Sequence, residues 1–427
     1  MNSPPLRSQR YIKQPYNSLE VYPTRLTQSQ WIESNKDNIT LLLAGSATPG
    51  LSIQDLIDLS TDKQTTTANL TFQTLKLNLG PLDGSHPLRT QIAALYDGSI
   101  TAEHIFPTHG TTGANALVFQ NLLSPGDHVI TMYPCYTQLI SLPKSVPDIE
   151  VSYWTLDLQN QAQPDIQALK DAIKPNTKMI ILNNPNNPLG TILPLKTQSD
   201  IVALAREHGL TLLVDEIFRP LFHDDSHQTQ NESQKQIPPS FIDLSTPSDK
   251  IVVTSSMSKA WGLSGTRIGW LATKNTSILS ACFDRGLYTI MALSSIDSAI
   301  AAEALSDRCR PQILAKHLNY ARRNIALLDG FVRDHAGACS WVKPVGGGTG
   351  FVRFFDKSGV PVDDVEFCKG VKGAKGVLLS PGSLCFGTRS EAGGDFRGYV
   401  RVHVTVDPGV MERALVAIEE YLEEYIA

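Results

Sequence analysis

Short apolar runs that end at polar or Gly/Pro turns constrain the fold of this chain most. They cover residues 129–132, 179–182, 210–214 and 251–254, and stretches with helical periodicity such as 200–208 lie between them. Apolar runs of this length without polar alternation are typical of parallel strands that are buried on both faces. The pattern therefore predicts an α/β protein with a mainly parallel sheet, and such sheets bind ligands at the carboxyl ends of their strands.

A lysine stands directly after the last of these runs, in the segment Ser256-Met257-Ser258-Lys259. A lysine amine that is desolvated at a strand end can form a Schiff base with an aldehyde. Arg267 follows on the same glycine-rich segment and could neutralise a phosphate. Together they suggest pyridoxal 5'-phosphate (PLP), whose ring is an electron sink for carbanion chemistry. Taken alone, Lys259 could equally be a solvated surface charge.

Two other strand ends carry polar side chains of the same kind. The run 180–182 ends in an Asn/Pro/Gly turn that contains Asn187, the candidate contact to the cofactor. Asp215 ends the run 211–214, where an ionised carboxylate is costly to bury without a cationic partner. A protonated pyridine nitrogen would be such a partner.

Three motifs follow one another in the chain: N-x-x-N-P-x-G at 184–190, D-E-x-F at 215–218 and S-x-S-K-x-x-G-L-x-G-x-R-I-G at 256–269. Together they resemble the class I and II aminotransferases of the fold-type I PLP enzymes. The resemblance extends from about residue 43 into the C-terminal segment. It implies a large PLP-binding domain with a mainly parallel seven-stranded sheet, and a smaller α+β domain.

The resemblance also implies roles for these residues. Lys259 would be the Schiff-base lysine and proton shuttle, Asp215 the partner of the pyridine nitrogen, and Asn187 a donor to the phenolic oxygen of the cofactor. The implied phosphate ligands are Ser256, Ser258 and Arg267.

The segment 104–119 reads as a strand that feeds a helix N-terminus, where free backbone N–H groups and the helix dipole favour an anion. The resemblance makes Thr111 and Thr112 phosphate contacts, although the same residues would also suit an ordinary helix cap. It also makes Tyr136, in the turn after the run 129–132, the aromatic residue that stacks on the pyridine ring. A half-buried core tyrosine is the alternative there.

Substrate contacts are expected from both ends of the chain. Arg401 lies on an alternating strand at 399–404 and can form the bidentate fork that a carboxylate needs, as the resemblance implies for the substrate. Arg397 is a competing candidate for the same role. In the loop 43–50, Gly45 and Ser46 are the residues that the resemblance places over the substrate.

Two positions depart from the pattern of the family. Leu79 stands where relatives usually carry a tyrosine that binds the cofactor phosphate of the neighbouring subunit, and Phe218 stands where many have a tyrosine that donates to the phenolic oxygen. Both changes affect the tuning of the reaction more than retention of the cofactor. The amino-acid sequences of segments 79–89, 112–115 and 346–353 resemble those of the family branch that contains capreomycidine synthase.

The length of 427 residues favours more than one domain, and we expect an N-terminal arm (1–50) that joins the small domain, a large PLP-binding domain (51–307) and a small C-terminal domain (308–427). A polar insert at 223–240 reads as an exposed loop or a cover of the substrate entrance. The net charge of −5 offers no basic surface for nucleic acid, and no run of roughly 20 apolar residues suggests a membrane span.

The six cysteines are scattered without a C-x-x-C pair, so we expect reduced structural thiols, including Cys135, and no metal site. Residues 1–14 lack an apolar signal region, which predicts a cytoplasmic protein. The resemblance further implies a homodimer, since the sites of the family are built at a subunit interface.

The sequence thus predicts a PLP enzyme that acts on an amino acid through an external aldimine and a quinonoid carbanion, most simply as an aminotransferase. The alternative is β/γ-elimination, replacement or cyclisation on the same scaffold, since fold does not settle reaction type. A catalytically inactive regulatory module is a third class. The intact set of Lys259, Asp215, Asn187 and Arg267 argues against that class.

Overall fold

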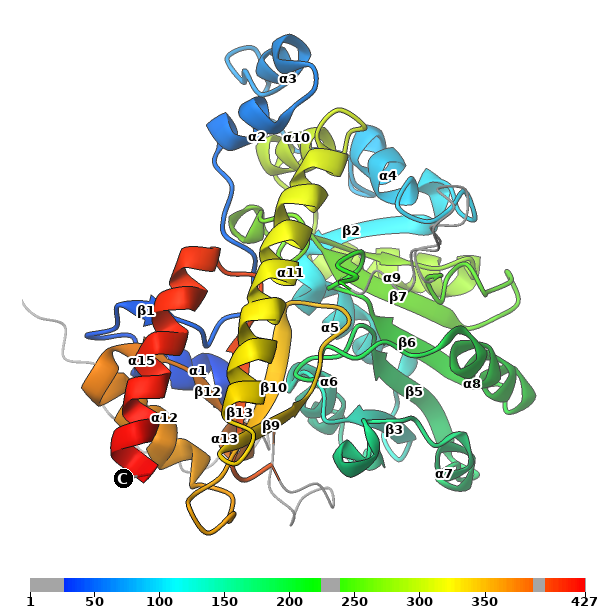
Figure 1. Cartoon of the computed structure of the whole chain (residues 1–427). Helices are drawn as coiled ribbons and strands as arrows, with labels where there is room; N and C mark the ends of the chain where they lie inside the picture. Colours follow the sequence, from blue (N-terminus) through cyan, green and yellow to red (C-terminus); the bar gives the residue numbers. More distant parts are fainter. Residues whose placement is uncertain (1–26, 224–238, 387–395, 427) are drawn as a thin grey trace, which may run out of the picture.

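The computed structural model describes residues 27–223, 239–386 and 396–426 of the chain (Figure 1). Within these residues, seven strands form a central sheet in the order β2-β8-β7-β6-β5-β3-β4. In chain order they are β2 (Ile105–His109), β3 (His128–Tyr133), β4 (Glu150–Thr155), β5 (Thr177–Asn183), β6 (Thr211–Asp215), β7 (Ile251–Ser256) and β8 (Ile268–Ala272).

The predicted mainly parallel, seven-stranded sheet is confirmed. β3, β4, β5, β6 and β7 pair in parallel, and β8 is antiparallel to both of its neighbours, β2 and β7. The four apolar runs of the sequence form β3, β5, β6 and β7, with small differences at the strand ends. All residues of β3, β6 and β7 are buried, which is the reason their sequences show no polar alternation.

Helices pack against this sheet. α5 lies on β2, β6, β7 and β8 and also contacts α9, while α8 packs on β6. The helices of this part of the chain are α2 (Ile53–Leu59), α3 (Lys63–Asn69), α4 (His86–Ala93), α5 (Gly110–Leu122), α6 (Gln138–Ser141), α7 (Ile166–Asp171), α8 (Leu195–Glu207), α9 (Thr276–Thr289) and α10 (Ser295–Ala304), with 3-10 turns η1 (Ala102–His104), η2 (Pro143–Ser145), η3 (Leu158–Asn160) and η6 (Ser264–Thr266).

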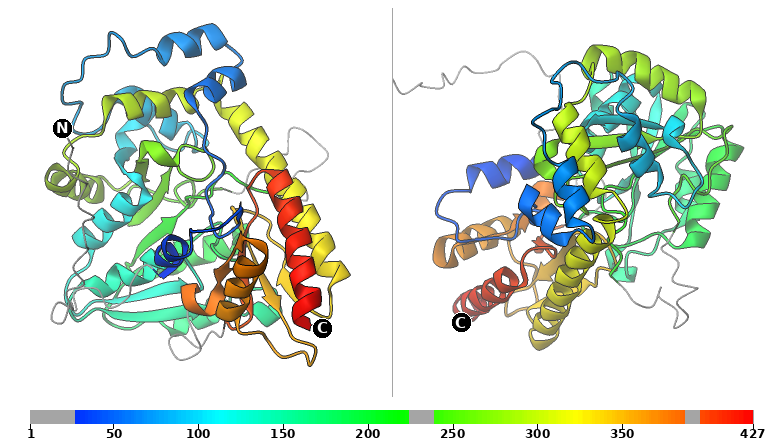
Figure 2. Two further views of the ribbon diagram at one scale, coloured as in Figure 1. Left: turned by 90° about the vertical axis from the view of Figure 1, so that its left-hand side faces the viewer. Right: turned by 90° about the horizontal axis from the view of Figure 1, so that it is seen from above.

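The C-terminal part builds a smaller, antiparallel sheet of order β12-β13-β10-β9 within the described residues. α11 packs on β9 of this sheet and runs side by side with α15, which contacts β1 and β11 (Figure 2). The elements of the C-terminal part are α11 (Arg310–Asp334), β9 (Cys339–Val342), β10 (Thr349–Phe354), α12 (Asp364–Lys375), β11 (Val377–Leu378), β12 (Ser380–Pro381), α13 (Gly382–Phe386), β13 (Tyr399–His403) and α15 (Pro408–Ile426).

α11 spans 25 residues because its apolar positions recur at helical spacing. Ile313, Ala321, Ile325 and Leu328 form one buried stripe along it. Pro311 stands in its first turn, where the missing N–H of proline costs no helical hydrogen bond. These features give one uninterrupted helix.

The N-terminal segment contains structure that its sequence does not suggest. α1 (Thr27–Ser34) is a helix, and β1 (Leu41–Leu42) pairs in parallel with β11. Trp31 Nε1 donates a 2.7 Å hydrogen bond to Leu379 O, so α1 is held on the C-terminal part. An eight-residue helix with one strongly buried aromatic is too short to show a helical period, and contacts with distant residues stabilise it.

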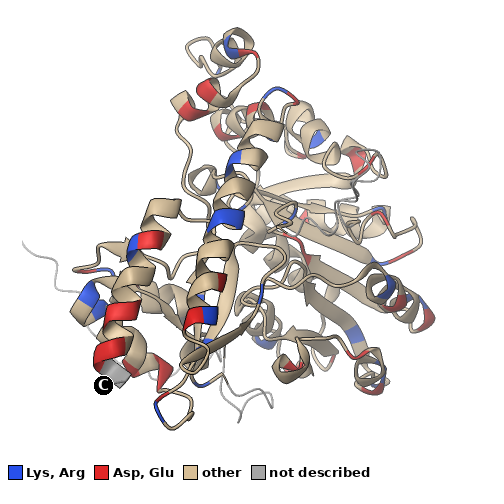
Figure 3. Ribbon diagram, viewed as in Figure 1, with Lys and Arg blue, Asp and Glu red and all other residues tan. Residues whose placement is uncertain are grey.

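The polar insert predicted at 223–240 lies outside the described residues except at its ends. The segment 1–14 lies wholly outside them. No helix of the described residues is long and apolar enough to cross a membrane. Basic and acidic residues are interspersed over the molecule rather than gathered in one field (Figure 3). All six cysteines are buried and free.

Candidate active site

A cavity of about 430 Å³ lies where the carboxyl ends of the central strands meet β13 and the N-terminal loop. Every residue to which the resemblance gives a cofactor or substrate contact lines it. They are Gly45, Ser46, Thr111, Thr112, Tyr136, Asn187, Asp215, Ser256, Ser258, Lys259, Arg267 and Arg401.

Lys259 follows β7 and is held by the N-terminal loop. Its Nζ donates a 2.9 Å hydrogen bond to Ser46 Oγ, and its carbonyl oxygen accepts one of 2.6 Å from Thr48 Oγ1. Burial lowers the pKa of the Lys259 amine to about 8, and the positive charge of Arg401 adds to this effect. A larger fraction of the amine is therefore neutral near pH 7 than for a solvated lysine, as attack on an aldehyde requires.

Asp215 ends β6 and is 1% exposed. Its Oδ1 accepts a 3.0 Å hydrogen bond from Ile217 N, and its Oδ2 accepts one of 3.4 Å from Asn115 Nδ2. Thr254 Oγ1 donates to Asn115 Oδ1 at 2.8 Å, which orients that amide toward Asp215. Burial raises the pKa of the Asp215 carboxyl to about 6, so a bound cation next to this carboxyl would favour its ionised form.

An anion cradle stands at the start of α5, which begins at Gly110 directly after β2. Gly110 has φ +66°, and a side chain there would meet Arg267 Nη2 at 2.8 Å. Gly110 N donates to Arg267 O at 2.8 Å, which fixes the arginine segment beside the helix N-terminus. The hydroxyl of Thr111 is buried and has no partner among the described residues. Free N–H groups, an orphaned hydroxyl and a guanidinium fit a phosphate.

Arg401 comes from β13 of the small sheet and is fully buried. Its Nη1 donates to Asn187 Oδ1 at 3.1 Å, and its Nη2 donates to the carbonyl oxygens of Ala44 and Gly45. Its Nε is buried without a hydrogen-bond partner, and no ion pair of the described residues includes it. A guanidinium with these features fits a ligand carboxylate.

Arg397, the competing candidate for binding the substrate carboxylate, does not line the cavity. It precedes β13 and its side chain is exposed.

Asn187 is oriented by Asn183, whose Oδ1 accepts a hydrogen bond from Asn187 N at 2.8 Å. Because Asn187 Oδ1 already accepts from Arg401, this amide can donate to a ligand through Nδ2.

The two departures from the family pattern lie in different places. Phe218 is 1% exposed and lines the cavity, so its ring replaces a hydroxyl at that wall. Leu79 is 66% exposed and does not line the cavity. Tyr136 lines the cavity, and burial raises the pKa of its hydroxyl, with the Asp215 charge adding to the effect.

Sequence reasoning missed several residues of the site. His403 lines the cavity two positions after Arg401, and the period of two in a strand could have indicated it. Asn115 lies one helical turn after Thr111, a spacing that places both on one face of α5. Gln28, Ser29 and Ile32 of α1 also line the cavity, and only the packing of α1 brings them there.

The cavity fits PLP on its own chemistry. Lys259 can take the aldehyde, the buried Asp215 suits a protonated ring nitrogen, and the cradle at Thr111 suits the phosphate. These groups belong to one cavity, as the three parts of a single small molecule require.

Comparison with known proteins agrees with this fit. A family model described as aminotransferase class I and II matches residues 51–418. Capreomycidine synthase of Streptomyces vinaceus is 26% identical over 343 residues, or 80% of this chain and 80% of that protein.

Two solved structures resemble the whole fold. A PLP-dependent aminotransferase from Streptococcus suis 89-1591 superposes with a TM-score of 0.81 at 30% identity, over 95% of this chain and 99% of that one. The PLP-dependent cyclase OrfR superposes with a TM-score of 0.78 at 21% identity, over 97% and 99% of the two chains, which is a likeness of fold.

Proposed function

The chain belongs to the class I and II aminotransferase family, whose members depend on PLP, and from this premise we propose that it transfers the amino group of a free amino acid to an oxo acid. One observation carries the proposal: the amine of Lys259, the carboxyl of Asp215 and the guanidinium of Arg401 line one cavity. An amino acid held by its carboxylate at Arg401 would enter the cavity that Lys259 lines.

Each residue has a task that its surroundings support. When bound, PLP supplies an electron sink for negative charge at the α carbon of the substrate. Arg401 binds and orients the carboxylate, and the buried Nε gains the partner that it lacks in the free protein. Asp215 holds the proton at the ring nitrogen of the cofactor.

Lys259 moves the α proton. Its pKa of about 8 suits this role, because a general base acts best when its pKa lies near the working pH. Ser46 Oγ, which accepts a hydrogen bond from Lys259 Nζ, positions the amine. The ring of Phe218, which is buried, keeps water from its side of the cavity.

The test is the identity of the products. The purified protein with PLP is incubated with single amino acids, with and without 2-oxo acids, and the mixture is analysed by mass spectrometry. Transamination converts the donor amino acid to its oxo acid and the added oxo acid to a new amino acid. The two products should form in equal amounts. Turnover of an amino acid without any acceptor would contradict it.

Elimination, replacement or cyclisation is the second candidate, and the similarity to capreomycidine synthase and to the fold of a PLP-dependent cyclase favours it. The same incubation distinguishes the two, since this candidate gives an altered or cyclic product with no amino acceptor.

We further propose that the chain works as a homodimer through an exposed apolar surface. Leu77, Leu79, Tyr288 and Met291 are 78%, 66%, 91% and 52% exposed. Gly80 approaches Leu293, so the 77–82 segment lies beside the one that follows α9. Large apolar side chains that are exposed on neighbouring segments are a feature of protein interfaces.

Light scattering after size exclusion should give twice the chain mass. The change Tyr288→Asp should shift the protein toward monomer, whereas Val416→Asp, at a separate exposed apolar residue, should not. A monomeric unmodified protein would contradict the proposal.

A further inference from the structure

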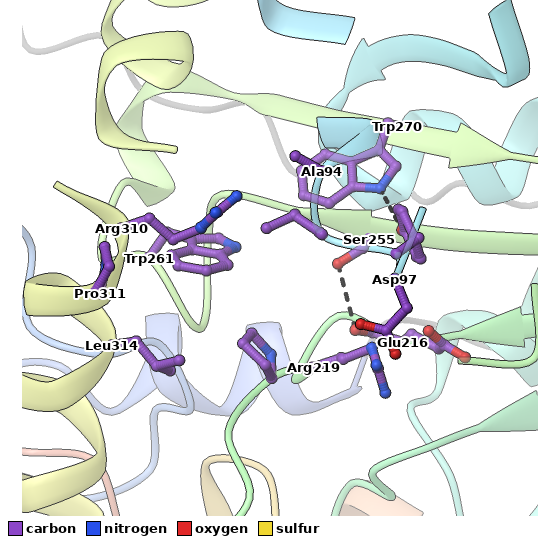
Figure 4. A pocket seen from close by; sticks show the side chains of 13 residues that line it. Ala94, Asp97, Glu216, Arg219, Ser255, Trp261, Trp270, Arg310, Pro311 and Leu314 are labelled. Atoms are coloured by element: carbon purple, nitrogen blue, oxygen red, sulfur yellow. Dashed lines mark hydrogen bonds between the residues drawn. The ribbon is translucent and has the colours of Figure 1, made fainter. Parts of the chain in front are cut away.

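A second cavity, of about 290 Å³, shares its wall segments with the candidate active site but none of its lining residues (Figure 4). Side chains alternate along a strand and its extension. Asp215 and Ser256 line the active-site cavity, and their chain neighbours Glu216 and Ser255 line the second one. The two cavities therefore lie on opposite faces of the same strand ends.

The body of the second cavity is aromatic. Tyr96, Trp261 and Trp270 line it and are at most 2% exposed. Trp270 Nε1 donates to Tyr96 OH at 2.8 Å, which fixes these two rings. Aromatic walls of this kind suit an aliphatic chain, and their faces attract a cation.

One side of the cavity carries an arginine with spare hydrogen-bonding capacity. Arg310 stands at the start of α11, together with Pro311 and Leu314 (Figure 4). Its Nη2 donates to Asp307 Oδ1 at 2.6 Å, at a rim where Asp307 is 91% exposed. Its Nη1 is buried and has no partner among the described residues. This end offers a donor to a carboxylate, with an acid beside it.

The other side is acidic. Asp97, Glu216 and Arg219 lie there, so two carboxylates face one guanidinium (Figure 4). Glu216 is 2% exposed, and its two oxygens accept hydrogen bonds from Phe241 N at 2.9 Å and Ser240 Oγ at 2.6 Å. Each carboxylate oxygen can accept a further bond. Burial raises the pKa of Glu216 to about 7 although the charge of Arg219 lowers it, so a further cation in this cavity would add to the stabilisation of the ionised carboxylate.

We propose that this cavity binds an elongated small molecule with a carboxylate at one end and a cation at the other, the class to which free basic amino acids belong. The α-carboxylate meets Arg310 and the α-ammonium meets Asp307 at the rim. The side-chain cation crosses the face of Trp261 and ends at Glu216. Because Glu216 is bonded to Asp215 in the chain, a ligand here contacts a segment that also lines the active site.

The probe is L-lysine, titrated calorimetrically into the PLP-loaded protein. Two matched analogues test the two ends: L-norleucine lacks the side-chain cation, and 1,5-diaminopentane lacks the carboxylate. L-lysine should bind at least tenfold more tightly than either. Equal affinity of either analogue would overturn the proposal, as would the absence of any binding at millimolar L-lysine.

Variants separate this site from the active site. Ala94 is exposed at the rim, so Ala94→Trp should block the cavity and weaken binding at least tenfold, while the control Ala94→Ser should not. Arg310→Gln should weaken it similarly. Arg401→Gln, which disables the carboxylate site of the active-site cavity, should leave this binding in place.

Binding that disappears in Arg401→Gln but persists in Ala94→Trp would locate L-lysine in the active site alone and overturn the proposal. The readout is binding rather than turnover, so a failure of the proposed transamination would leave this result unaffected.

Discussion

Arg401 Nη1 donates a 3.1 Å hydrogen bond to Asn187 Oδ1, and this bond ties strand β13 of the small sheet to the turn that follows β5 of the central sheet. The same guanidinium donates to the carbonyl oxygens of Ala44 and Gly45 in the N-terminal loop. Three segments that are far apart in the sequence therefore meet at one buried cation. Removing the Arg401 guanidinium should therefore weaken substrate binding more than removing any exposed arginine.

We predict that Arg401→Lys lowers kcat/KM by about two orders of magnitude, since a buried charge pair is worth about 2–5 kcal/mol and lysine cannot reproduce the planar fork. The loss should appear mainly in KM for the amino acid. The control is Arg397→Lys, at the exposed arginine that competes for the same role. Steady-state kinetics of the two variants should show a lower kcat/KM for Arg401→Lys and an unchanged kcat/KM for Arg397→Lys. A larger loss at Arg397 would mean that the carboxylate is bound there instead.

Lys259→Ala should abolish turnover and covalent attachment of PLP, because no other amine lines the cavity among the described residues. Attachment is measured as the mass added to the chain after borohydride reduction. Lys250→Ala, at an exposed lysine just before β7, serves as the control and should retain both properties. Attached cofactor in Lys259→Ala would refute this assignment.

The pH dependence of PLP attachment to the cofactor-free protein should follow the Lys259 amine. The amine attacks an aldehyde only when it is neutral, and its pKa is lowered to about 8. The initial rate at limiting PLP should therefore rise with pH through a midpoint at about pH 8 and level off about one pH unit above it, rather than continue to rise toward the ordinary lysine pKa of about 10.4. In Arg401→Gln, where a neighbouring positive charge is lost, the midpoint should move to higher pH. A midpoint unchanged in that variant would contradict the electrostatic coupling.

Asn115→Ala should shift the acidic limb of the pH–kcat/KM profile to higher pH. The hydrogen bond from Asn115 lowers the pKa of Asp215, so its loss raises the pKa of a carboxyl that must be ionised to hold the ring nitrogen. Asn121→Ala, at another asparagine of α5 and outside the cavity, is the control. An unchanged acidic limb in Asn115→Ala would mean that Asp215 does not control it.

Gly110→Ala should weaken PLP binding at least tenfold. The added Cβ would lie 2.8 Å from Arg267 Nη2 and would displace the guanidinium from the phosphate cradle. Gly98→Ala is a matched control, because Gly98 also has a positive φ but a Cβ there meets nothing within 4 Å. Both variants should lose about 1 kcal/mol of folding free energy to backbone strain, whereas only Gly110→Ala should lose affinity in a fluorescence titration with PLP.

The sequence by itself determined the central sheet and the segments that meet at its edge. Strands β3, β6 and β7 and the segment 179–183 of β5 could be predicted because both of their faces are buried, which leaves unbroken apolar runs. Lys259, Asp215 and Asn187 follow such runs closely, and parallel strands bring their carboxyl ends to one edge. Their proximity was therefore predictable from local pattern alone.

The tertiary structure alone decided which distant side chains complete the site. Both Arg401 and Arg397 were compatible with the sequence, and the packing of β13 against the N-terminal loop buries the first and leaves the second exposed. Likewise, no local pattern in the sequence indicates helix α1 or the second cavity beside Trp261. The physical reason is that burial and cavities arise from contacts between segments hundreds of residues apart, whereas sequence periodicity reports only on neighbours within one element.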